Sequence, residues 1–166
     1  MKHLTLSLMT LSLVLSAAIF GFFYAWVCST MWGLDETDAR VAIQAMQAMN
    51  GSVRNMVFAP AFFGTPLCLA ATAALLLKQK HRSAGVFFAI SALTYLCGGL
   101  ILTMSINVPM NEALGAVTVP TDLAQAQIIW GEYSPKWQFW NQFRTVVSGL
   151  SFVLALMGVM QFSKQR

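Results

Sequence analysis

The chain has 166 residues, of which 57% are hydrophobic and only 10% are charged, and its net charge is +4. This is the composition of a bilayer protein rather than a soluble domain, and the length fits one domain. Because the basic residues lie in short tracts between apolar stretches, the positive charge reports membrane topology and gives no reason to expect a nucleic-acid partner.

Four apolar stretches are each long enough to cross about 30 Å of hydrocarbon, which takes roughly 20 helical residues. We predict membrane spans at about residues 4–31, 53–77, 83–107 and 138–162. Short connections favour antiparallel packing of neighbours in sequence. The sequence therefore predicts an all-α fold, an integral membrane antiparallel four-helix bundle that forms a single domain over residues 1–166.

Basic and acidic residues are separated along the chain. Three acid-free tracts hold Lys2, Lys78, Lys80, Arg82, Lys164 and Arg166. Two gaps between the spans hold Asp35, Glu36, Asp38, Glu112, Asp122 and Glu132. Since basic loops stay on the cytoplasmic side, we predict a multi-pass protein of the cell membrane (inner or plasma membrane), with both termini cytoplasmic.

The first span begins after Lys2 and His3, as the core of a signal peptide does. It continues without a break to Met31, which is too long for a typical signal core, so we expect it to be retained.

Residues 36–50 follow the first span and contain neither glycine nor proline. Their helix formers predict a short outward helix with Asp35 as its N-cap. We expect this amphipathic helix to lie along the outer membrane face. The residues directed toward the lipid would be Val41, Ala45, Met46 and Met49.

The second outward loop follows the third span. Residues 119–122 predict a turn and an N-cap, and a polar helical stretch follows over residues 122–130. Ser134 and Pro135 predict a break before the fourth span. We therefore expect this loop to be partly ordered.

Five tryptophans fall at or beyond the outer ends of the spans, namely Trp26, Trp32, Trp130, Trp137 and Trp140. One interpretation is an aromatic belt at the level of the lipid headgroups. The other is an aromatic wall around a planar ligand. The sequence leaves both open.

Polar residues gather at the outer ends of three spans. They are Asn50 and Arg54 before the second span, Asn107 and Asn111 at the end of the third, and Trp137, Trp140, Asn141 and Arg144 at the start of the fourth. Within each group the three-to-four spacing favours one helix face. An antiparallel bundle brings the groups to one level, so we predict a ligand site there. Snorkelling arginines and asparagine caps are the alternative.

Three motifs carry these residues: Ala45-Met-Gln-x-Met-Asn50, Asn107-x-Pro-x-Asn-x-x-Leu114 and Trp140-Asn-x-x-Arg144. Together they resemble the signature of the small four-helix membrane proteins grouped with the anthrone oxygenases. Many bacterial members have no known function. Fungal relatives oxidise an anthrone to the anthraquinone with molecular oxygen and no evident cofactor. The resemblance thus implies a cofactor-independent oxygenase that acts on a lipophilic aromatic or quinone-like substrate at the outer membrane face.

Such a reaction needs a base and a pocket that stabilises an aromatic anion. Arg54 and Arg144 are candidates to hold the anion, with the asparagines donating hydrogen bonds and Trp137 or Trp140 stacking on the ring. Because the sequence does not choose a base between carboxylates such as Glu112 and Glu132, catalytic residues stay unassigned. The alternative is a non-catalytic membrane module that binds a lipid, a quinone or a partner helix at the same cluster.

Metal sites find little support in the sequence. His3 and His81 are both predicted on the cytoplasmic side, which argues against a haem, zinc or di-iron centre in the bundle, so we expect no metal and no cofactor. Thioethers suit Cu(I), which leaves a copper alternative near the outer face at Met31, Met46, Met49, Met56, Met104 and Met110. The sequence predicts no oligomeric state.

Overall fold

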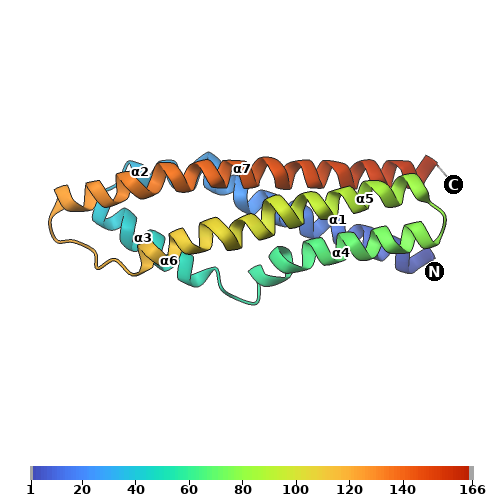
Figure 1. Cartoon of the computed structure of the whole chain (residues 1–166), viewed down its shortest axis with the longest axis horizontal. Coiled ribbons are helices and arrows are strands. Elements are labelled where there is room, and N and C mark those ends of the chain that lie inside the picture. The colour runs from blue at the N-terminus through green and yellow to red at the C-terminus, as the bar shows by residue number, and fades with distance from the viewer. Residues whose placement is uncertain (1, 165–166) are drawn as a thin grey trace.

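The computed structural model describes residues 2–164, and over this range the chain is helical with no strand (Figure 1). Arg166, one of the basic residues used to predict orientation, lies outside the described residues. Four helical segments are long and apolar enough to cross a membrane: His3–Asp35, Phe58–Lys78, Arg82–Gly115 and Leu123–Lys164. The protein is therefore an all-helical multi-pass membrane protein, as predicted.

π-helical turns interrupt the first and third segments, whereas the second and fourth are each one continuous helix. The first comprises α1 (Lys2–Ala25), the π-helical turn η1 (Trp26–Thr30) and α2 (Met31–Asp35), and it is followed by α3 (Ala39–Ser52). The second is α4 (Phe58–Lys78). The third comprises α5 (Arg82–Tyr95), the π-helical turns η2 (Leu96–Ile101) and η3 (Thr103–Asn107), and α6 (Val108–Gly115). The fourth is α7 (Leu123–Lys164).

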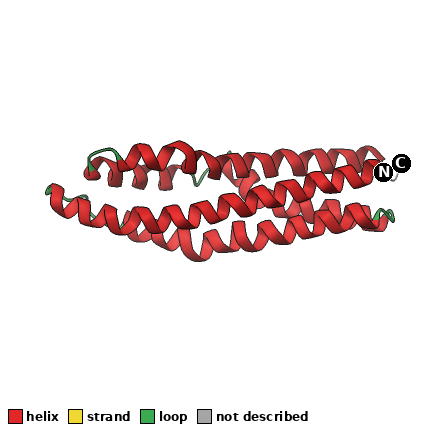
Figure 2. Ribbon diagram, turned by 90° about the horizontal axis from the view of Figure 1, so that it is seen from above, coloured by secondary structure: helices red, strands yellow, loops and turns green. Residues whose placement is uncertain are grey.

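Successive long helices run in opposite directions, and both chain ends lie at one end of the bundle (Figures 1 and 2). Both α1 and α5 pack against α4 and α7, which closes the bundle. Buried hydroxyls link facing helices, with Ser12 and Thr72 Oγ atoms 3.0 Å apart and Ser91 and Ser151 also 3.0 Å apart. These bonds satisfy polar groups that would be costly to leave unpaired in a membrane interior.

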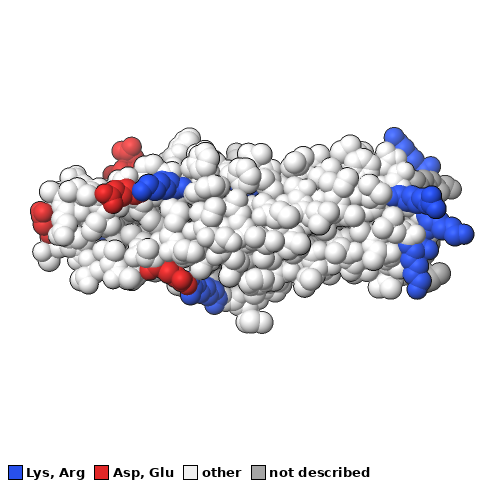
Figure 3. Space-filling model, viewed as in Figure 1, with Lys and Arg blue, Asp and Glu red and all other residues white. Residues whose placement is uncertain are grey.

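Charge is segregated in space as it is along the chain. Lysine and arginine side chains gather at the end where the termini lie, and the acidic side chains in view lie at the opposite half (Figure 3). The basic groups visible in that half lie next to acidic ones (Figure 3). The described residues form two ion pairs, Arg40 with Asp38 and Arg54 with Glu112.

The charge distribution yields a topology prediction. Reporter fusions after Gln79 and at the C-terminus are expected to report the cytoplasm, and fusions after Asp38 and Thr118 the exterior, because basic loops are retained inside. The measurement is the activity of a reporter that works on only one side of the membrane. An exterior signal from residue 79 would contradict the orientation.

The predicted outward helix is present as α3, but its N-cap and its packing differ from the prediction. Asp38, not Asp35, caps the helix, because its Oδ1 accepts from Arg40 N at 2.9 Å. The buried face consists of Ala39, Ala42, Ile43 and Met46, whereas Val41 is 53% exposed. This face packs in one apolar cluster with Ala126, Trp130 and Tyr133 of α7, so it is covered by protein rather than by lipid.

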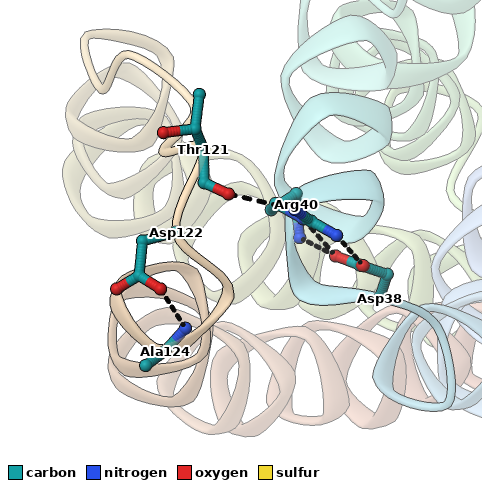
Figure 4. A network of polar contacts seen from close by, with 5 residues as sticks. All are labelled: Asp38, Arg40, Thr121, Asp122 and Ala124. Carbon is teal, nitrogen blue, oxygen red and sulfur yellow. Dashed lines mark hydrogen bonds and ion pairs between the residues drawn. The ribbon is translucent and has the colours of Figure 1, made fainter.

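Arg40 joins α3 to the loop before α7 (Figure 4). Its Nη1 donates to the Thr121 carbonyl at 3.0 Å, while its Nη2 donates to Asp38 Oδ2 at 2.6 Å. The hydrogen bonds from Arg40 lower the pKa of the Asp38 carboxyl to about 2. The cap is therefore ionised at any ordinary pH. Asp122 caps α7 in the same loop by accepting from Ala124 N at 3.4 Å.

The break predicted at Ser134 and Pro135 is wrong, because α7 continues through both residues. A proline inside a helix removes one backbone hydrogen bond. Hydrogen bonds to Asp35 hold α7 on both sides of Pro135. The Asp35 carboxylate accepts from Trp130 Nε1 at 2.9 Å, Ser134 Oγ at 2.7 Å and Gln138 Nε2 at 2.8 Å. Asp35, predicted as a cap, thus joins α2 to α7.

Two further helix boundaries differ from the predicted spans. The third helical segment continues past residue 107 to Gly115, since Pro109 stands in the first turn of α6, where a missing N–H is tolerated. The second helix begins at Phe58 rather than at residue 53. Asn55 ends the intervening turn, with its Oδ1 accepting from Val57 N at 2.8 Å and Phe58 N at 3.0 Å. Residues 53–57 are therefore a turn segment between α3 and α4.

A prediction about helix packing follows from Gly158 of α7. A Cβ built there would lie 2.7 Å from the Phe88 ring and 3.3 Å from the Ala84 carbonyl oxygen of α5. We expect Gly158→Ala to destabilise the bundle by about 1–3 kcal/mol, because α5 and α7 must separate. Thermal unfolding in detergent measures this. Gly21→Ala is the control, since a Cβ built there has no atom within 4 Å other than those of its chain neighbours and its own helix backbone. Equal unfolding midpoints for the two variants would contradict the close approach.

Candidate functional site

A cavity of about 540 Å³ lies where the predicted polar cluster was expected. Its walls come from α1, η1, the end of α3, the 53–57 turn segment, the start of α4, η3, α6 and α7. This volume is in the range of small-molecule sites. The bundle therefore has room for a ligand, in an open cavity at the level where the three polar groups meet.

One part of the wall is aromatic, and its lining residues are Phe22, Phe23, Trp26, Phe58, Phe62, Phe63 and Trp137. The rings contact one another: the centroids of Trp26 and Trp137 are 5.0 Å apart, and those of Phe22 and Phe58 are 4.9 Å apart. Such a wall favours a flat apolar ligand, which packs against ring faces and edges.

Arg144 is the buried cation of the cavity. Its side chain is at the wall, yet the residue is only 5% exposed. Nη2 donates to Asn141 Oδ1 at 2.8 Å and Nη1 donates to Thr103 Oγ1 at 3.3 Å. Cζ lies 4.5 Å from the centroid of Phe23 and 5.4 Å from that of Trp137. The guanidinium is thus held by neutral hydrogen-bond acceptors and two aromatic rings.

No carboxylate within residues 2–164 pairs with this cation, because the ion pairs there are those of Arg40 and Arg54. Arg144 Nε also has no hydrogen-bond partner among those residues. A buried charge without a partner is costly, so such groups are usually functional. The arrangement is suited to an anion that enters the cavity.

Two asparagines lie behind the cavity wall. Asn141 is 1% exposed, and its Nδ2 donates to the Phe23 carbonyl at 3.1 Å. This bond sets the orientation of the amide, whose Oδ1 accepts from Arg144. Asn107 is fully buried, and neither of its amide atoms has a partner in the described part of the chain. Neither asparagine is among the residues that line the cavity. Asn141 is therefore connected to the cavity through its hydrogen bond with Arg144.

Asn111 orients the tryptophan in the wall. Its Oδ1 accepts from Trp137 Nε1 at 2.9 Å and from the Tyr133 hydroxyl at 2.9 Å. The same hydroxyl lies 3.5 Å from Asn50 Nδ2, which donates to it. This network joins α3, α6 and α7, and it holds Trp137 in one orientation beside Arg144. Tyr133 was not among the predicted ligand residues.

Arg54 and Glu112 form an ion pair in the same cavity wall, with Nη2 and Oε1 3.1 Å apart. Both side chains are 60% exposed, so solvent screens the pair and it adds little stability. Glu112 carries the single carboxylate among the described residues that line the cavity. Glu132, the other predicted candidate base, is exposed and not in the wall.

The predicted cluster is therefore brought together in large part. Asn50, Arg54, Asn111, Trp137 and Arg144 line the cavity, and Asn141 supports Arg144. Trp140 does not join them. Its ring packs beside Phe139 and Phe143, with centroid separations of 5.1 and 6.2 Å, as in an aromatic belt.

Sequence reasoning missed the contribution of the first span. Phe22 and Phe23 face the cavity from α1. Thr103 was missed as well; it belongs to η3 in the third segment, and its hydroxyl accepts from Arg144. The only sequence signal was that Phe22 and Phe23 lie four and three residues before Trp26, on one face of the helix. Lipid-facing helices show the same spacing of apolar residues, so it did not indicate a cavity.

The six methionines of the copper alternative divide into two groups. Met31 and Met46 belong to the apolar cluster beneath α3, and Met110 packs against it. Met56 and Met104 line the cavity, and Met49 both lines the cavity and packs against the cluster. In the described range, no three His, Cys, Asp or Glu side chains gather as a metal site would require.

A family model described as anthrone oxygenase matches residues 54–154. The matched segment contains Arg54, Glu112 and the residues of α7 that line the cavity, while Asn50 precedes it. No curated protein and no solved structure matches the chain. Because the matched segment covers more than half of the 166 residues, the chain belongs to the anthrone oxygenase family.

Proposed function

We propose that this protein is an oxygenase that oxidises a lipophilic phenolic aromatic in the cavity, at the outer face of the membrane. The observation that carries the proposal is Arg144, a buried cation that faces an aromatic cavity with no carboxylate partner among the described residues. A flat aromatic anion would supply the missing charge and pack against Phe23 and Trp137. Family membership supports the same reaction class.

The reaction begins at a methylene group that lies between two aromatic rings and opposite a carbonyl. Removal of one C–H proton gives an anion whose charge is delocalised onto the carbonyl oxygen. A hydrogen bond from Arg144 to this oxygen stabilises the anion, and the apolar aromatic side chains around Arg144 strengthen that interaction. The residue therefore lowers the barrier to the first proton transfer.

Molecular oxygen then adds to the carbanion carbon and gives a peroxide anion, which takes up a proton. The hydroperoxide loses the second C–H proton and expels hydroxide, so that a carbonyl and one water are formed. In sum, a methylene and one oxygen molecule yield a carbonyl and one water. We assign both C–H proton removals to Glu112, because it is the carboxylate in the cavity wall.

The direct test is purified protein in detergent, supplied with 1,8-dihydroxyanthrone in air. We expect the absorbance of the anthraquinone to appear together with one oxygen consumed per quinone. Anthrones also oxidise without a catalyst, so the rate is compared with that of protein denatured by heat. Equal rates for the two preparations would overturn the oxygenase proposal.

The second candidate is a non-catalytic module that binds a lipid, a quinone or a partner helix in the same cavity. It is favoured by one observation: Glu112 is paired with Arg54 and largely exposed, which is a modest environment for a base. Tight binding of a quinone that depends on Arg144, without turnover of any anthrone, would support this candidate over the oxygenase.

A further inference from the structure

A second hollow adjoins the cavity. It is a groove of about 430 Å³ between α1 and the start of α4. The apolar residues of its wall that do not also line the cavity are Ala18, Ile19, Val57 and Ala61. Its polar lining residues are Ser52 and Asn55, and none of its lining residues is charged. The groove is thus an apolar space beside a charged and aromatic one.

The two hollows share a wall. Phe22, Trp26, Met49, Val53, Asn55 and Phe58 line both of them. The rings of Phe22 and Phe58, one from each helix, stand at this shared boundary with centroids 4.9 Å apart. A ligand that is longer than the cavity therefore extends into the groove by displacing only side chains.

The 53–57 turn segment borders both hollows and presents apolar side chains outward. Met56 is 85% exposed and Val57 is 88% exposed. Side chains of this kind on a span boundary are solvated by lipid rather than by water. The outer rim of the groove consequently faces the bilayer, where an alkyl chain is dissolved without cost.

We propose that the groove holds the alkyl or prenyl chain of a phenolic amphiphile whose ring lies in the cavity against Arg144. The position of the ring rests on the proposed function, and the chain-binding groove goes beyond it. Charge complementarity places the anionic ring with the cation, and the shared wall places the chain in the uncharged groove. The substrate class is therefore a phenol or quinol that carries a long apolar tail, reached from the bilayer.

The test uses 2-hydroxy-3-alkyl-1,4-naphthoquinones, which are flat anions near neutral pH, with either a methyl or a dodecyl chain. Binding to the protein in lipid nanodiscs is followed by quenching of tryptophan emission, since Trp26 and Trp137 line the cavity. Partition of each probe into lipid is the same for all variants. Ratios of affinity between variants therefore report the protein alone.

Ala18→Phe and Ala61→Phe fill the groove from its two sides. We expect each to weaken binding of the dodecyl probe by about 5- to 150-fold, the cost of overpacking, and to leave the methyl probe within twofold. Ala17→Phe is the matched control, because Ala17 is also exposed on α1 and lines neither hollow. It is expected to bind both probes like the wild type.

Three results would overturn the proposal. If both groove variants bind the dodecyl probe like the wild type, the groove holds only a bilayer lipid chain. That result would not contradict the ring site beside Arg144. If the variants weaken both probes equally, they reshape the cavity and no separate chain site exists. If neither probe binds the wild type, or if Arg144→Met changes nothing, the ring site fails, and the proposed function fails with it.

Discussion

Replacing Arg144 by methionine is expected to lower the affinity for a phenolate ligand by about 1.5–3 kcal/mol, or roughly 10- to 150-fold. Arg144 is 5% exposed and makes no ion pair with any described carboxylate, so under the proposed function the bound anion would be its charged partner. Oxidation of an anthrone should fall by at least the same factor, because the charge on the oxygen is larger in the transition state. Affinity is measured by quenching of tryptophan emission, and turnover by quinone absorbance.

The protein is expected to remain folded in this variant. Methionine keeps the apolar stem, and it gives up the hydrogen bonds to Asn141 Oδ1 and Thr103 and the contacts of the guanidinium with the Phe23 and Trp137 rings. Arg144→Lys is the second variant: it keeps the charge but loses the planar fork, so it should recover part of the affinity. If Arg144→Met and Asn111→Ala both yield only aggregated protein, the cluster holds the fold rather than a ligand.

Glu112→Gln is expected to reduce kcat for anthrone oxidation by about 10²–10⁴-fold, the usual contribution of a general base. The amide is isosteric with the carboxylate and still accepts from Arg54, so KM should change little. Steady-state rates in air-saturated detergent solution measure the effect.

Glu132→Gln is the matched control, because this carboxylate belongs to the same outward part of the chain but lies outside the cavity wall. It is expected to leave kcat within twofold of the wild type. An unchanged kcat in Glu112→Gln would show that water or another group removes the proton, and the carboxylate would then serve only to pair with Arg54.

The predicted residues that line the cavity show how much of the candidate site can be predicted from the sequence. Asn111 and Arg144 were placed together from two facts alone: each stands at the outer end of an apolar stretch, and consecutive spans are antiparallel. Span length and charge sign are properties of local sequence and of the bilayer, so they need no knowledge of contacts between helices. The family resemblance rested on the same residues, and the match over residues 54–154 confirms it.

The details that make the cavity chemically specific depend on contacts between distant residues. Phe22 and Phe23 look like any lipid-facing residues until α1 is packed against α4 and α7. The absence of a carboxylate beside Arg144 can be judged only once the neighbours of every helix within residues 2–164 are known.

The sequence by itself determined the number of long helices, their alternation and the common level of the polar residues away from the chain ends, because hydrophobic length and charge act along the chain. Tertiary structure alone decided that α7 passes through Pro135, that Asp35 joins α2 to α7, and that the apolar face of α3 is covered by protein. In each case local propensity was overridden by hydrogen bonds and apolar contacts from residues remote in sequence, which no local pattern encodes.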